Sequence, residues 1–146
     1  MSIEIKHKTT GYVLFTAETE NFDGKYLGYQ NFSGADISGL RFTRADLRYC
    51  VFTGARIPWA SRDVIAAILF QSAGDDADKR AFAGLVLISR DWCWDSFDAC
   101  VRDGVLRDWI VDTLAPYTEG DIHTPVALKR EQRRRLRAKA LAERTA

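Results

Sequence analysis

The sequence predicts a mixed β/α fold with an N-terminal β-hairpin, a short four-sided coil and a C-terminal helical half. Three observations predict it. Alternating apolar residues flank a glycine-bearing loop near the N-terminus, a large apolar residue recurs at every fifth position from Phe22 to Ile57, and apolar stripes at helical spacing follow Pro58. We place hairpin and coil in residues 1–59, a helical subdomain in 60–123 and a basic helix or tail in 124–146.

The N-terminal segment has the pattern of a β-hairpin. Ile3 and Ile5 alternate with charged residues, Val13 and Phe15 begin a second alternating run, and Thr9-Thr10-Gly11 lies between the two. The exposed end of a stacked coil carries unpaired backbone groups that invite further pairing. We therefore expect the hairpin to cover one end of the coil.

Between residues 20 and 59 the apolar pattern has a period of five, which neither a helix nor a flat strand has. A chain that turns a corner every five residues forms a coil with four sides, so residue n stacks on residue n+20. Positions two residues before each large apolar residue are small or apolar from Ala35 onward, which suits limited inward space. Eight slots carry the pattern: Phe22, Leu27, Phe32, Ile37, Phe42, Leu47, Phe52 and Ile57.

Twenty-residue stacking places like residues on like, with Phe22 against Phe42 and Phe32 against Phe52. Two coils at ordinary strand spacing would rise by about 10 Å. The first coil has poor inward residues, which predicts that it is distorted. These residues are Glu20, Lys25 and Gln30.

Two stretches, Ala35-Asp36-Ile37 and Ala45-Asp46-Leu47, follow the pattern A-[DN]-L-x-x. Residues 20–59 thereby resemble the pentapeptide-repeat proteins, and residues 10–18 resemble the lead-in of bacterial and phage members. The resemblance implies a right-handed quadrilateral β-helix. Some long members of that family mimic a DNA rod and occupy topoisomerases, but two coils in a segment of charge +1 have neither the length nor the negative charge for this role.

Beyond Pro58, apolar spacing and capping residues predict helices. Ser61 is expected to cap the first and Gly74 to end it. Thr124-Pro125 is expected to open the last as N-cap and first helical residue. Between these, we expect helices over Asp76–Ser89, Trp92–Val101 and Val105–Tyr117.

The sequence offers no constellation for catalysis, a metal or a cofactor, so we expect none of the three. His7 and His123 lack metal-ligand spacing, and the acids between Gly74 and Lys79 lack the pattern of a calcium loop and fit a helix start. The three cysteines form no CxxC motif and are expected to be buried apolar thiols: Cys50, Cys93 and Cys100.

Composition also bears on localisation. An odd cysteine count suits the reducing cytosol. The N-terminus lacks the apolar region of a signal peptide, and no run of apolar residues is long enough to cross a membrane. We therefore expect a cytoplasmic protein that does not contact a membrane.

Residues 58–123 carry a formal charge of −6 and include a tryptophan pair. On a helix, Trp92 and Trp94 cannot share one face, so one is expected in the core and the other at least partly exposed. An exposed tryptophan beside Asp95 would suit a protein interface. The alternative is that Trp94 packs on the end of the coil near Trp59.

Residues 124–146 carry a charge of +6. Such a run is a solvated or frayed helix, a nucleic-acid contact or a docking element for an acidic protein surface. No aromatic residue lies among the arginines, which argues against stacking on single strands. The candidate contact residues are Arg130, Arg133, Arg134, Arg135 and Arg137.

These observations predict a non-catalytic protein-interaction module, with a homodimer or a foreign protein as partner. A phage or mobile-element inhibitor of a host nucleic-acid-related factor would fit the size and build. Two alternatives stay open: a nucleic-acid-binding accessory protein that acts through the basic tail, and an enzyme whose residues meet only in the fold.

Overall fold

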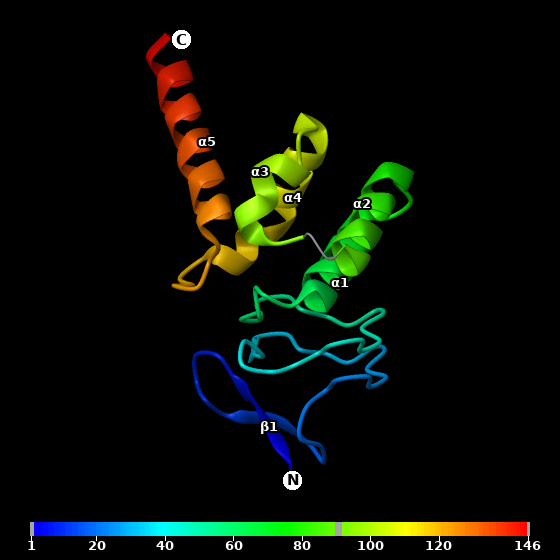
Figure 1. Cartoon of the computed structure of the whole chain (residues 1–146). Helices are drawn as coiled ribbons and strands as arrows, with labels where there is room; N and C mark the ends of the chain where they lie inside the picture. Colours follow the sequence, from blue (N-terminus) through cyan, green and yellow to red (C-terminus); the bar gives the residue numbers. More distant parts are fainter. Residues whose placement is uncertain (1, 90–91, 146) are drawn as a thin grey trace. The chain divides into compact units, whose positions relative to one another are not determined.

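The computed structural model describes residues 2–89 and 92–145. The chain divides into two compact units, residues 1–89 and 90–146, here called the N-terminal and C-terminal units (Figure 1). This division differs from the boundaries set by composition, because the first two helices belong with the repeat segment and the basic helix belongs with the preceding helices.

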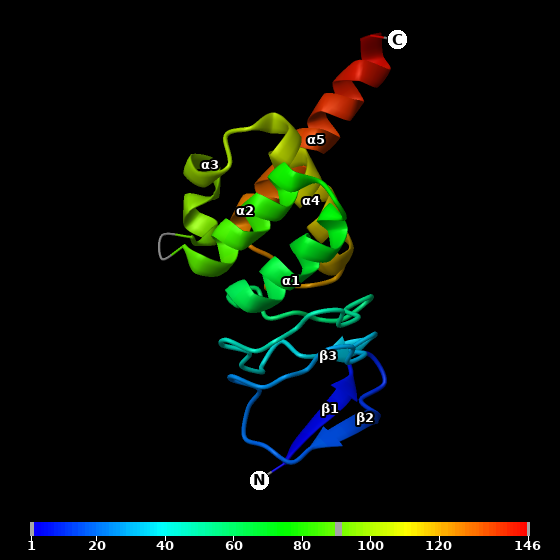
Figure 2. The same cartoon turned by 90° about the vertical axis from the view of Figure 1, so that its right-hand side faces the viewer.

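The N-terminal hairpin is confirmed. Strands β1 (Ile3–His7) and β2 (Val13–Ala17) pair antiparallel, and Gly11 in the loop has a φ of 74°. The short strand β3 (Ala35–Asp36) pairs with the other edge of β1, so the sheet order is β2-β1-β3. The hairpin thus covers one end of the repeat segment, as Figure 2 shows.

The repeat segment turns in the same way every five residues. At each turn, the N–H of the third residue after a large apolar residue donates to that residue's carbonyl, as from Lys25 to Phe22 at 3.1 Å and from Ala55 to Phe52 at 2.9 Å. The same bond forms throughout the first coil, so the expected distortion of its backbone is wrong. The turn uses backbone atoms only, and the Lys25 side chain simply lies exposed.

Residues twenty apart pair across two layers. Parallel bridges join Tyr26 to Asp46, Asn31 to Val51 and Asp36 to Arg56. The predicted ring stacks are confirmed, with centroids 5.4 Å apart for Phe22 and Phe42 and 5.8 Å apart for Phe32 and Phe52. The core of the N-terminal unit is therefore a column of apolar side chains inside the coil.

Helix α1 (Arg62–Ala73) lies at the other end of the repeat segment (Figure 2). The Ser61 hydroxyl accepts the Val64 N–H as predicted, at 3.2 Å. Two hydrogen bonds join α1 to the repeats: the Arg44 N–H donates to Asp63 at 3.2 Å, and the Gln71 amide donates to the Cys50 carbonyl at 2.7 Å. These bonds explain why α1 belongs to the N-terminal unit.

Helix α2 (Ala77–Ile88) packs beside α1. The Asp76 carboxylate accepts the Lys79 N–H at 3.1 Å, which confirms that the acidic stretch is a helix start. Phe82 and Val86 are buried. Among the described residues, no helix combines the length and apolar character needed to cross a membrane.

The described part of the C-terminal unit contains a 3-10 turn, one short helix and two longer helices. The predicted helix over Trp92–Val101 is reduced to a 3-10 turn, η1 (Trp94–Ser96), and the short helix α3 (Phe97–Cys100). Cys93 is fully extended, with φ −154° and ψ 163°. Aromatic, Cys, Asp and Ser residues are weak helix formers, which explains the shortening.

Helix α4 (Gly104–Thr118) is confirmed within a residue of each predicted end. Helix α5 (Val126–Thr145) begins after Pro125, whose carbonyl accepts the Lys129 N–H at 3.1 Å. The Thr124 hydroxyl donates to the Asp121 carbonyl at 2.9 Å. It therefore closes the preceding turn, and the predicted capping role of Thr124 is not the one observed.

The Asp36 carboxylate predicts that the N-terminal unit loses stability in acid. Burial favours the neutral acid, but hydrogen bonds from the Ser38 hydroxyl and N–H and the Arg56 guanidinium outweigh it and hold the pKa of Asp36 below its ordinary value of 3.8. A folded-state pKa below the unfolded one contributes stability above the unfolded value, and this is lost as pH falls through the folded pKa.

We expect Asp36→Asn to lower the free energy of unfolding at neutral pH by about 1 kcal/mol or less, because the ion pair is partly exposed. The difference in the free energy of unfolding between wild type and Asp36→Asn should shrink as the pH falls through the folded-state pKa of Asp36. Urea unfolding across pH measures it, and comparison of the two proteins at each pH cancels the other titrating groups. A gap that does not change with pH would contradict the assignment.

Candidate interaction surfaces

An aromatic cluster in the C-terminal unit contains both predicted tryptophans. The rings of Trp92 and Trp94 meet edge to face, with centroids 5.6 Å apart, and both pack on Phe97 at 6.4 and 6.0 Å. Phe97 is fully buried, whereas both tryptophans are partly exposed. The expectation that one tryptophan enters the core is therefore wrong, because the extended Cys93 lets both rings stand on Phe97.

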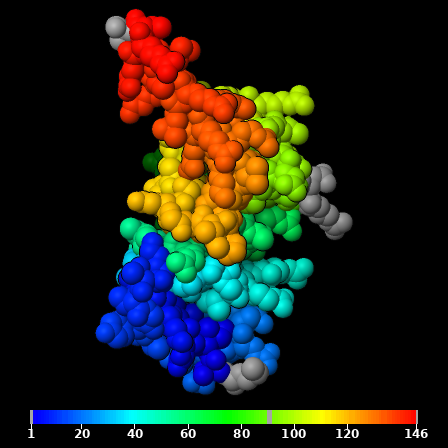
Figure 3. All heavy atoms as spheres, turned by 90° about the vertical axis from the view of Figure 1, so that its left-hand side faces the viewer, coloured from blue at the N-terminus to red at the C-terminus, as the bar shows by residue number. Residues whose placement is uncertain are grey.

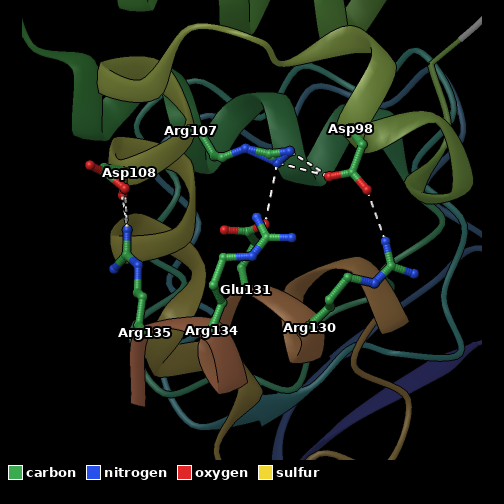
Figure 4. A network of polar contacts seen from close by, with 7 residues as sticks. All are labelled: Asp98, Arg107, Asp108, Arg130, Glu131, Arg134 and Arg135. Atoms are coloured by element: carbon green, nitrogen blue, oxygen red, sulfur yellow. Dashed lines mark hydrogen bonds and ion pairs between the residues drawn. The ribbon is translucent and has the colours of Figure 1, made fainter. Parts of the chain in front are cut away.

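Charged residues of α3, α4 and α5 form a polar network, which Figure 4 shows. The network reaches the cluster at Phe97. The Arg107 guanidinium of α4 lies 4.9 Å from the centre of the Phe97 ring and bonds to Asp98 of α3. The other oxygen of Asp98 accepts from Arg130 of α5 at 2.9 Å. The structure thus brings the predicted residues Trp92, Trp94 and Arg130 together around Phe97 and Asp98. Asp95, which lies between Trp94 and Phe97 in the sequence, is exposed.

Glu131 joins α5 to α4 from a buried position. Its carboxylate accepts from Arg107 at 3.3 Å and from Arg134 at 2.6 Å, and only 7% of its side chain is exposed. The sequence did not predict roles for four residues of this region: Phe97, Asp98, Arg107 and Glu131. Glu131 had a visible signal, since it is the single acid in the first half of a basic helix. No pattern in the sequence marks Asp98 and Arg107, since their ion pair depends on how α3 and α4 pack.

The predicted tail arginines divide into two groups. Arg135 bonds to Asp108 at 2.9 Å and to Asp112, and hydrogen bonds to Asp112 and then Asp108 hold its pKa above the ordinary value. Arg133 and Arg137 are exposed and form no ion pair within the described part of the chain. The first half of α5 is therefore a docked helix, and only part of its charge remains available.

The cysteines differ from one another. Cys50 is buried as predicted, its thiol donates to the Leu27 carbonyl at 3.0 Å, and burial raises its pKa. Cys93 and Cys100 are exposed, so their predicted burial is wrong. Cys93 lies in extended backbone before η1, and Cys100 is the last residue of the short helix α3. A hydrogen bond with the Ser96 hydroxyl lowers the pKa of Cys93.

An aromatic face on the repeat segment was also missed. Tyr29 and Tyr49 are stacked with centroids 4.9 Å apart, and Tyr26 lies nearby; these three side chains are 71%, 64% and 69% exposed. Both stacked tyrosines have left-handed backbone, with φ of 66° and 61°, at the turn slot that holds glycine at 24, 34 and 54. The period of five in the sequence is enough to locate this turn position. A bulky residue there is strained.

Replacing both Tyr29 and Tyr49 with glycine should change the free energy of unfolding by less than about 1 kcal/mol. Glycine relieves the left-handed penalty of about 1–2 kcal/mol per residue. Loss of the ring pair costs about 0.5–1.5 kcal/mol, and glycine adds unfolded-state entropy worth about 0.4–1 kcal/mol per site. Urea unfolding checks the balance.

The matched control is the double alanine variant, which loses the same ring pair but keeps the backbone strain. It should be less stable than the double glycine variant. The reverse order would show that the turns are not strained.

The comparisons with known proteins bear on the repeats. The family model described as Pentapeptide repeats (8 copies) matches residues 31–61. No curated protein and no solved structure matches the chain. The matched segment lies within the part that turns every five residues and pairs at a spacing of twenty. Residues 31–61 of the N-terminal unit are therefore a segment of pentapeptide repeats.

Proposed function

We propose that this chain is a non-catalytic protein-interaction module whose contact surface is the Trp92–Trp94–Phe97 cluster of the C-terminal unit. The observation that supports it is the pair of partly exposed tryptophans standing on one buried ring. Tryptophan and arginine are enriched among residues that dominate binding energy, and such anchors lie within a polar rim. Asp95, Asp98 and Arg130 supply charges of both signs around this anchor.

The repeat segment is, in this proposal, a short right-handed quadrilateral β-helix that gives the N-terminal unit a rigid core. The recurrent turns and the parallel pairing of residues twenty apart support that geometry. The hairpin and α1 cover its two ends, which removes the exposed edges that would otherwise aggregate.

A rim with both charge signs suits a protein partner better than a polyanion. Both a second copy of the chain and a foreign protein fit this surface, and a host nucleic-acid-related factor is the foreign partner that the sequence suggests. Most soluble homo-oligomers are symmetric dimers, so the first case predicts that the same cluster meets itself.

The experiment compares Trp94→Ala/Asp95→Lys with Leu141→Ala/Glu143→Lys, a matched pair of changes at exposed positions of α5. Circular dichroism first establishes that both variants are folded. Light scattering measures the oligomeric state, and capture from nuclease-treated bacterial lysate measures foreign partners. We expect the cluster variant to lose a dimer or a partner that wild type and control both keep. A folded cluster variant that keeps both would overturn the proposal.

A further inference from the structure

We propose that the outer face of α5 binds the phosphate backbone of nucleic acid. The contact residues form a row, Arg133, Arg137 and Arg144, here called the outer cation row. At 3.6 residues per turn these side chains lie within about 40° of one another around the helix, and they extend over about 16 Å of its length. All three are exposed.

The opposite face of α5 is already occupied. Ala127, Leu128 and Glu131 are buried there, and Arg135 is held by Asp108 and Asp112 of α4. The outer cation row forms no ion pair within the part of the chain that the structure describes. Figure 3 shows α5, coloured orange to red, with one face not covered by α3 or α4.

No acid of α5 lies on the row. Helical geometry places the buried Glu131 about 140° and Glu143 about 100° away from the centre of the row. Lys129 and Arg130 lie beside its first residue and add positive charge, although Arg130 shares Asp98 with Arg107. The row therefore presents positive charge with little local cancellation, and this charge defines a polyanion as the ligand.

The row fits nucleic acid better than a membrane surface. Leu136 and Leu141 are exposed but lie about 140° apart around the helix, so α5 has no apolar stripe to enter a bilayer. A helix fits against a duplex, and arginine binds phosphate oxygens in pairs. No aromatic side chain stands on the row, so it would contact the backbone without reading bases or stacking on them.

The test measures fluorescence anisotropy of a labelled DNA duplex and a labelled single-stranded RNA of equal length against salt, with the full chain. About three phosphate contacts give a log–log salt slope near −3 on duplex DNA. The triple variant Arg133→Gln/Arg137→Gln/Arg144→Gln should lower affinity more than tenfold and bring the slope close to zero. Preference between the two probes tells which nucleic acid supplies the phosphates.

Two matched variants sharpen the result. Lys25→Gln/Arg41→Gln/Arg44→Gln removes three exposed cations from the N-terminal unit and should leave binding unchanged, which separates the row from net charge. Asp108→Asn/Asp112→Asn releases Arg135 on the opposite face of α5 and should leave the salt slope unchanged, because Arg135 lies about 180° from the centre of the row and cannot contact the same phosphates.

The proposal is overturned by no binding of either probe at low salt, or by equal losses in the row variant and the N-terminal control. It is also overturned if polyglutamate or anionic vesicles compete better than nucleic acid, because the ligand is then an acidic protein or a membrane. The Trp94→Ala/Asp95→Lys variant should keep nucleic-acid binding, so this result and that of the proposed function are independent.

Discussion

Replacing Phe42 with alanine is expected to lower the free energy of unfolding of the N-terminal unit by about 3–5 kcal/mol, the range for a buried aromatic residue. Phe42 is 1% exposed, and its ring stacks on Phe22 at 5.4 Å and meets the edge of Phe32 at 6.0 Å. Turn bonds on both sides and pairing between layers fix the backbone around it, so the cavity cannot collapse.

Urea unfolding followed by far-UV circular dichroism, with hydrogen exchange at the repeat amides, assigns the loss to this unit. Phe42→Leu is the control, because it keeps most of the apolar volume and should cost roughly 1 kcal/mol. A loss below about 1 kcal/mol for the alanine variant would mean that the aromatic column does not hold the layers together.

The repeat segment could be predicted from the sequence because its signals are local. Each turn is closed by a backbone bond over three residues, and each large apolar side chain follows from the same period. The pairing of Phe22 with Phe42 needs only that period. The same rule overestimated the effect of Lys25, because a turn made by backbone atoms tolerates a side chain that points away.

For the aromatic cluster, amino-acid composition indicated which residues make contacts but not how they are arranged. Trp92 and Trp94 were identifiable as contact residues, but their arrangement on Phe97 depends on an extended Cys93 and a single short turn. Such short elements are set by tertiary packing and not by helical periodicity.

The charge pattern of the sequence has a structural counterpart. The acidic middle and the basic tail, −6 and +6, are partly paired within the C-terminal unit through Asp98 with Arg130 and Asp108 with Arg135. Counting charges along the chain could not show this, because the partners are more than twenty-five residues apart. Among the described residues, the outer cation row forms no ion pair, which is why its variants separate binding from stability.

Replacing Arg107 with alanine is expected to lower the free energy of unfolding of the C-terminal unit by about 2–3 kcal/mol. Arg107 is 17% exposed, bonds to Asp98 and Glu131, and covers the Phe97 ring. Without it, buried Glu131 keeps only Arg134, whose side chain is 61% exposed. Removing one partner of a buried ion pair costs about 3–5 kcal/mol, and the remaining Arg134 reduces that figure.

Unfolding in urea followed by near-UV circular dichroism reports mainly on this unit, which contains three of the four tryptophans, Trp92, Trp94 and Trp109. The decisive control is Arg107→Met/Glu131→Leu, which removes both charges and keeps apolar volume. Because the cost of the single variant arises from an uncompensated buried carboxylate, the double variant should recover most of the stability. If the double variant is less stable than Arg107→Ala, the network stabilises α5 by its own attraction, and the loss in Arg107→Ala has a different cause.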